Sequence, residues 1–138
     1  MTGLTLSDLP AHDYRVEAAT QCREVAAGFE QNLTTPGVMV YQSDRLYGML
    51  SRSSFVNHMA KGYNTEVYPK RAVQVMVDYL KPEALVLPAA TPIMEAARQA
   101  IDRLAPHTYD PIVVDANGTL SLVDMHDLMK AVVGSMVA

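Results

Sequence analysis

The chain has 138 residues, of which 49% are hydrophobic and 19% are charged, so it can bury a core and is not expected to be disordered. Its net charge of −4 argues against a nucleic-acid binder, which usually carries a basic excess. The sequence also predicts a cytoplasmic protein. No apolar run approaches the roughly 18 residues of a membrane span, the N-terminus lacks the features of a signal peptide, and the single cysteine cannot form an internal disulfide.

The chain is predicted to begin with a short strand over residues 4–6 and then a helix. Asp13 is a residue type that caps helix N-termini, and apolar residues follow it at helical spacing. These residues are Ala18, Cys22, Val25, Ala26, Phe29 and Leu33. We therefore expect a helix with one buried face, in which Cys22 is an inert core thiol rather than a reactive one.

A β-hairpin and a short helix are predicted next. Apolar residues dominate 38–41 and 46–50, and residues 43–44 between them are typical of a turn. Either Ser51 or Ser53 is expected to begin the helix, because serine is a favoured N-cap residue.

Residues 68–80 fit both a strand and a helix, and we favour a connecting helix. A strand is then expected over 84–87, ended by Pro88. Thr91 as N-cap and Pro92 as the first helical residue predict a helix start. The expected buried face of this helix comprises Ile93, Ala96, Ala97, Ala100, Ile101 and Leu104.

The end of the chain predicts a second hairpin and a last helix. The strands are expected over 111–115 and 120–123, and the Asn-Gly sequence at 117–118 is a strong hairpin signal. Asp124 is expected to cap the helix. Its apolar face would comprise Met125, Leu128, Met129, Val132, Val133 and Met136.

Four segments of the first half recur in the second half in the same order, which indicates a duplication. Residues 9–11 and 17–19 recur 78 residues later, residues 36–40 recur near 111–114, and residues 50–55 recur at 123–128. We therefore predict two repeats, 1–64 and 65–138, that form one compact tandem module.

These features resemble the CBS domain in its usual tandem pair. The resemblance rests on the alanine-rich helix after Thr91-Pro92, on the strand and turn over 111–118, and on the capped helix that follows. Family members often read Gly-x-x-[Ser/Thr]-x-x-[Asp/Asn] at the start of that helix. Residues 48–54 lack the final acid, whereas residues 121–127 lack the glycine but keep the acid.

The resemblance implies an α/β fold of two β-α-β-β-α repeats, packed through their sheets about a pseudo-twofold axis. It also implies clefts that hold AMP, ADP, ATP or S-adenosylmethionine, and a homodimer without a required cofactor. Such modules, including those attached to bacterial signalling proteins, usually regulate an attached or partner enzyme or transporter and catalyse nothing themselves.

Asp127 is the strongest candidate ligand-binding residue. A carboxylate can accept hydrogen bonds from the two adjacent hydroxyls of a ribose, and the resemblance implies this role at this position. Asp124 would be a second acceptor. The alternative is that both residues only stabilise the helix start. The first repeat has Ser51 and Ser54 at these places, so the sequence predicts one adenosyl ligand per chain.

Other candidates have strong structural alternatives. Thr91 lies near a helix start, where anions collect, but it is also an N-cap type. Ile112 and Val113 would contact an adenine, unless they are only core residues. Candidate partners for a phosphate are Arg52, Lys70, Arg71, His107 and His126.

Two other classes of function were compared with a nucleotide sensor. Asp124, His126 and Asp127 lie close to Ser121, but no nucleophile elbow, phosphate-binding loop or zinc motif is present, so an enzyme is not expected. A ligand-free dimerisation or protein-docking module is the alternative, because the methionine-rich last helix suits an adaptable interface.

Overall fold

A computed structural model describes residues 3–137. They form two compact units, residues 14–83 and residues 3–13 with 84–137. We call them the β1–β3 unit and the β4–β6 unit after the strands given below. Their bounds differ from the predicted repeats 1–64 and 65–138, because Leu6 is buried in the core of the β4–β6 unit.

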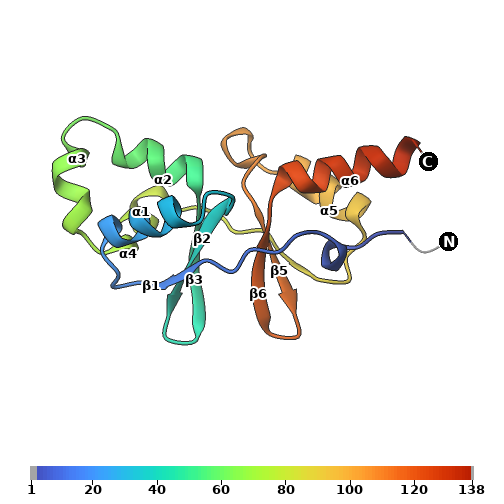
Figure 1. Cartoon of the computed structure of the whole chain (residues 1–138), viewed down its shortest axis with the longest axis horizontal. Helices are drawn as coiled ribbons and strands as arrows, with labels where there is room; N and C mark the ends of the chain where they lie inside the picture. The colour runs from blue at the N-terminus through green and yellow to red at the C-terminus, as the bar shows by residue number, and fades with distance from the viewer. Residues whose placement is uncertain (1–2, 138) are drawn as a thin grey trace. The chain divides into compact units, whose positions relative to one another are not determined.

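The β1–β3 unit places helices around a three-stranded sheet (Figure 1). Its elements are β1 (Arg15–Glu17), α1 (Cys22–Gln31), β2 (Gly37–Gln42), β3 (Arg45–Ser51), α2 (Arg52–Met59), α3 (Asn64–Val67), η2 (Tyr68–Lys70) and α4 (Val73–Leu80). Strand β1 pairs in parallel with β2, and β2 pairs antiparallel with β3. The predicted hairpin is confirmed, and α4 confirms the helix favoured within 68–80.

The core of this unit forms around one face of α1. Cys22, Val25 and Phe29 are buried there, and the Phe29 ring lies edge-on to Tyr14 with centroids 5.2 Å apart. Leu33 is 79% exposed, which corrects the predicted apolar face, because α1 ends two residues earlier at Gln31. Ala18 is buried, but it precedes the helix.

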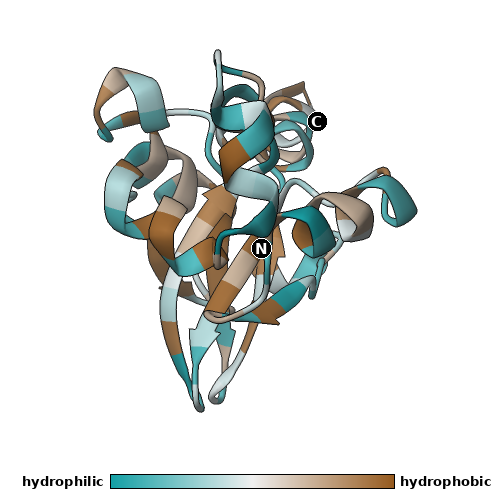
Figure 2. Ribbon diagram, turned by 90° about the vertical axis from the view of Figure 1, so that its left-hand side faces the viewer, coloured by the Kyte–Doolittle hydropathy of each residue, from teal (hydrophilic) through white to brown (hydrophobic). Residues whose placement is uncertain are grey.

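The β4–β6 unit has the same strand order and pairing. Its elements are η1 (Leu6–Asp8), β4 (Val86–Pro88), α5 (Ile93–Ile101), η3 (Ala105–His107), β5 (Ile112–Ala116), β6 (Thr119–Val123) and α6 (Met125–Val137). Strand β4 is parallel to β5, and β5 is antiparallel to β6. Asn117 and Gly118 have φ values of 55° and 92°, which confirms the predicted turn. Figure 2 shows hydrophilic hairpin ends and hydrophobic strand segments nearer the helices.

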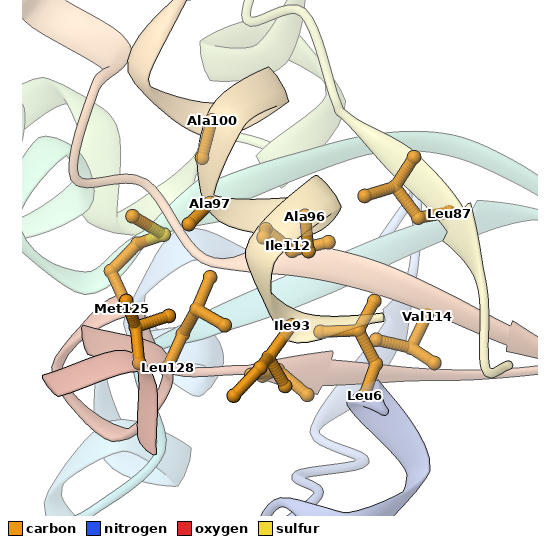
Figure 3. Packing of buried hydrophobic residues seen from close by; sticks show 12 residues of the cluster. Leu6, Leu87, Ile93, Ala96, Ala97, Ala100, Ile112, Val114, Met125 and Leu128 are labelled. Carbon is orange, nitrogen blue, oxygen red and sulfur yellow. The ribbon is translucent and has the colours of Figure 1, made fainter. Parts of the chain in front are cut away.

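Small residues bring α5 close to its sheet. Figure 3 shows three alanines of this helix facing side chains of β5 and α6. The helix and its neighbours contribute Ile93, Ala96, Ala97, Ala100, Ile112, Val114, Met125 and Leu128 to one buried cluster.

Both predicted helix faces of this unit are too long at their C-terminal ends. Ile101 and Leu104 are 58% and 74% exposed, because α5 ends at Ile101. Val133 and Met136 are 56% and 71% exposed, because they follow Val132, the last buried residue of α6.

The starts of α1 and α5 correct two predictions. The N-cap of α1 is Gln21, not Asp13, which precedes β1. The N-cap of α5 is Pro92, so Thr91 lies one residue outside the helix. Residues 4–6 likewise form no strand, since η1 begins at Leu6.

The two units have equivalent elements, but two of the predicted sequence matches are not equivalent in structure. Strands β1 and β4 begin at Arg15 and Val86, and α1 and α5 begin at Cys22 and Ile93, so both pairs are 71 residues apart. The matches at 78 residues are therefore wrong. The true signal is the Ala-Ala-Thr sequence at 18–20 and again at 89–91, before each helix.

Candidate ligand-binding site

The start of α6 carries two acidic residues with different surroundings. The Asp124 carboxylate accepts a hydrogen bond of 3.1 Å from the His126 N–H, which confirms Asp124 as the helix cap. Asp127 is half-buried in the first turn, and within residues 3–137 its carboxylate has no hydrogen-bond or ion-pair partner. Asp127 therefore retains its full acceptor capacity at a helix end that favours negative charge.

The remaining candidates of the β4–β6 unit are held by the backbone or buried. Thr91 donates its N–H to the Pro88 carbonyl and accepts from the Leu6 N–H, both at 3.0 Å. Ile112 and Val113 are completely buried in β5, and Ile112 belongs to the core beneath α5 and α6. His126 is exposed.

His107 has an acidic partner in the structure. Its Nδ1 lies 2.9 Å from the carboxylate of Asp110, which is buried. Arg103 closes the same loop by donating to the Thr108 and Asp110 carbonyls at 2.9 and 2.7 Å. This pairing gives His107 a structural role in the connection between α5 and β5.

The equivalent helix start in the β1–β3 unit has no carboxylate. The Ser51 hydroxyl accepts a hydrogen bond of 3.1 Å from the Ser54 N–H, so Ser51, not Ser53, caps α2. Ser54 lies at the position that Asp127 has in α6, three residues after the cap. A hydroxyl is a weaker and less directed partner for a ribose diol than a carboxylate.

Arg52 has a structural role that the sequence did not reveal. Its guanidinium donates to the carbonyls of Thr35 at 3.0 Å and Phe29 at 3.2 Å, and also to that of Asn32. It also stacks over the Phe29 ring, 4.7 Å from the centroid. These contacts join the C-terminal end of α1 to the start of α2.

Lys70 and Arg71 are exposed at the end of η2. Their carbonyls accept hydrogen bonds from the Gln21 side chain at 3.4 Å and from the Cys22 N–H at 2.8 Å. The backbone therefore fixes this segment against the start of α1.

The β1–β3 unit also contains a cavity of about 350 Å³. Its wall is formed by two valines and by His58, Tyr63, Asn64, Tyr68, Arg71 and Tyr79. Of these residues, sequence analysis singled out only Arg71. The others are far apart in the sequence, and only the packing of α2, α3, η2 and α4 brings them together.

Two classes of site have no support in residues 3–137. These residues contain no group of three or more His, Cys, Asp and Glu side chains that could hold a metal ion. Among the same residues, no helix is both long enough and apolar enough to cross a lipid bilayer.

Comparison with known proteins identifies the second half of the chain. Residues 75–134 match the family model of the CBS domain. The chain contains a CBS domain. No curated protein matches the chain.

Solved structures extend the likeness to nearly the whole chain. A CBS-domain-containing protein from Kribbella flavida is 14% identical with a TM-score of 0.70, over 94% of this chain and 99% of the other. CBSX2 from Arabidopsis thaliana, a CBS-pair protein, is 20% identical with a TM-score of 0.68, over 99% of each chain. The CBS domain of a bacterial CNNM/CorC-family Mg²⁺ transporter, solved in complex with ATP, is 14% identical with a TM-score of 0.68, over 95% and 88%.

These likenesses confirm the predicted family and fold class. The chain has the mixed α/β fold of a CBS-domain pair, with one three-stranded sheet in each unit. The predicted site residues are not tested by this agreement, because identities of 14–20% establish the fold alone.

Proposed function

We propose that this chain is a regulatory module that binds an adenosine-containing small molecule in the β4–β6 unit. The carrying observation is Asp127, whose half-buried carboxylate has no partner within residues 3–137. Two structural neighbours support the ligand class, since CBSX2 has been solved in complex with AMP and the Mg²⁺ transporter CBS domain with ATP.

The chemistry of the helix start suits a ribose. Asp127 can accept hydrogen bonds from both hydroxyls of the diol, and the second carboxylate oxygen of Asp124 is a further acceptor in the same turn. The exposed His126 is the nearest basic side chain in sequence for a phosphate group. None of these residues is assigned a catalytic step.

The difference between the two units predicts the stoichiometry. Ser54 replaces the acid at the start of α2, and Arg52 already donates to three carbonyls. We therefore expect one adenosyl ligand per chain, and a titration with two equivalent sites would contradict this expectation.

Calorimetric titration and thermal shift with AMP, ADP, ATP and S-adenosylmethionine test the proposal. Ligand at a hundred times its dissociation constant stabilises the folded state by about 2.7 kcal/mol. Asp127→Asn should abolish the shift, because the amide replaces an acceptor with a donor. The matched control is Asp44→Asn at the exposed β2–β3 turn, which changes the same charge and should bind like the wild type.

The outcomes separate the alternatives. Binding that survives in Asp127→Asn overturns the assigned site. A folded wild type that responds to none of the four compounds overturns the ligand class.

A ligand-free docking or dimerisation module is the second candidate. The last turn of α6 favours it, because Val133, Met136 and Val137 are 56%, 71% and 77% exposed. A homodimer in the cytoplasm that controls a partner enzyme or transporter is compatible with either candidate. Sedimentation at several concentrations, with and without nucleotide, distinguishes a ligand-dependent assembly from a ligand-independent one.

A further inference from the structure

The cavity of the β1–β3 unit is separate from the start of α6 in the chain, and the proposed function does not use it. It is enclosed by α2, α3, η2 and α4, which all belong to the β1–β3 unit (Figure 1). Its volume of about 350 Å³ lies at the small end of the range of about 300–1,000 Å³ that is typical of ligand pockets. A single-ring or double-ring molecule therefore matches its size.

We propose that this cavity binds a planar aromatic molecule that carries one carboxylate group. The argument rests on the aromatic wall, on an unpartnered buried histidine and on the charge around the cavity.

Four rings surround the cavity. The His58 ring lies edge-on to Tyr68 with centroids 4.6 Å apart, and it is tilted by 36° to Tyr79 with centroids 5.1 Å apart. Tyr63 and Tyr79 are 76% and 69% exposed, so large parts of these rings have no partner in the protein. Edge and offset-stacked contacts with such rings favour a planar aromatic guest.

His58 supplies unused hydrogen-bonding capacity in the wall. The residue is only 5% exposed, and neither ring nitrogen has a hydrogen-bond partner in the structure. The backbone around it is fixed, because the Asn64 amide donates to the His58 carbonyl at 3.0 Å. A buried polar group without a partner is unfavourable, so a ligand carboxylate that accepts from the imidazole N–H would remove this deficit.

Burial and the nearby Lys61 lower the pKa of His58. The ring is therefore neutral at pH 7 and has one N–H donor and one bare nitrogen. Such a ring can serve as a donor to an anion without bringing a second full charge into the wall.

The charge around the cavity selects an anion. Arg71 is the charged residue of the wall, and none of the lining residues is acidic. Asp78 lies on α4 but accepts a hydrogen bond from the Tyr47 hydroxyl, and Glu66 on α3 is exposed. An aromatic cage often binds a cation, but the guanidinium of Arg71 and the effect of Lys61 on His58 disfavour one here.

Titration with 2-naphthoate, indole-3-carboxylate and benzoate tests the proposal on the whole chain. Binding is followed by calorimetry and by the NMR signals of the His58 ring nitrogens. The chain has no tryptophan, so indole fluorescence reports the ligand alone. We expect at least one carboxylate to bind and to shift the His58 signals, and its uncharged amide to bind at least tenfold more weakly.

Variants assign the contacts. Arg71→Gln removes the cation, and His58→Phe keeps a ring while removing both nitrogens, so each should weaken binding at least tenfold. Arg45→Gln is the matched control, because Arg45 is an exposed arginine at the start of β3 and does not line the cavity. Unfolding curves of the variants identify any loss that results from misfolding, and Tyr79→Leu then provides an independent test of the aromatic wall.

Several results would overturn the proposal. These are the absence of binding by all three carboxylates, equal binding of the amide, and unchanged affinity in Arg71→Gln and His58→Phe. Asp127→Asn should leave this binding unchanged, and excess AMP should not displace the carboxylate. The two proposed sites can therefore fail independently.

Discussion

Arg52 provides a quantitative test of how the β1–β3 unit is held together. Its guanidinium donates to the carbonyls of Phe29, Asn32 and Thr35, which follow one another at and beyond the end of α1. It also covers the ring of Phe29, which is itself 2% exposed. One side chain therefore satisfies carbonyl groups that the helix end leaves open.

The expected effect of removing Arg52 follows from these contacts. Each hydrogen bond from a charged donor at a partly exposed site contributes about 0.5–1 kcal/mol, below the range for buried charged groups. The contact of the guanidinium with the aromatic face adds about 0.5–1 kcal/mol. Arg52→Ala should therefore lower the free energy of unfolding by about 2–3 kcal/mol, which is a fall in Tm of roughly 10 °C.

Arg52→Lys separates geometry from charge. Lysine keeps the positive charge, but an ammonium cannot reproduce the planar fork that reaches several carbonyls at once. We expect a loss of about 1–2 kcal/mol, intermediate between wild type and Arg52→Ala. The control is Arg45→Ala at the exposed start of β3, which should change stability by less than about 0.5 kcal/mol.

Urea unfolding monitored by circular dichroism measures these differences. If both Arg52 variants unfold within about 0.5 kcal/mol of wild type, the structural role argued for Arg52 is refuted. A role as a phosphate ligand makes a different prediction. In that case Arg52→Ala would change nucleotide affinity and leave the stability of the unliganded protein unchanged.

Three further predictions concern packing, thiol chemistry and capping. Gly28→Ala should be destabilising, because the added Cβ would lie 2.0 Å from the Tyr14 hydroxyl, whereas Gly134→Ala meets nothing within 4 Å and should stabilise α6 by about 0.5–1 kcal/mol; equal effects in urea unfolding would contradict this. Burial raises the pKa of the Cys22 thiol to about 11 from 9.0, so Cys22 should not react with Ellman's reagent in the folded protein at pH 8. Its contribution to stability should be complete below pH 9 and decline toward pH 11, because the unfolded thiol ionises first; rapid labelling of native protein would refute the assigned burial. Asp124→Ala should lower stability by about 1 kcal/mol, while Asp124→Asn should retain most of the cap, as measured by thermal unfolding.

Features with a local cause were predictable from the sequence. Asn117-Gly118 is confirmed as a turn because both residues adopt positive φ values that few other residues tolerate. Asp124 and Ser51 cap their helices through bonds to backbone N–H groups two or three residues away. Such contacts lie within one turn of chain and need no knowledge of the remaining fold.

Features that depend on distant residues could not be predicted. Thr91-Pro92 has the composition of an N-cap and first helical residue, but Pro92 is the cap because the Thr91 carbonyl accepts from the Leu6 N–H. Arg52 depends on carbonyls 17 to 23 residues earlier in the chain. The wall around His58 requires four helical segments to pack before it exists.

The two units show how a duplicated framework can carry different chemistry. Each unit places a capped helix directly after its hairpin, with Ser51 or Asp124 as the cap. In the β4–β6 unit the third residue after the cap is Asp127, an acid without a partner among residues 3–137, so that helix start retains capacity for a ligand. In the β1–β3 unit the corresponding residue is Ser54, and the adjacent Arg52 is occupied by three carbonyls. The unpartnered polar side chain of that unit is instead His58, at the far end of α2. The same helix thus uses its first turn for stability and its last turn for the wall of a cavity, which is why we place two different ligand chemistries in one chain.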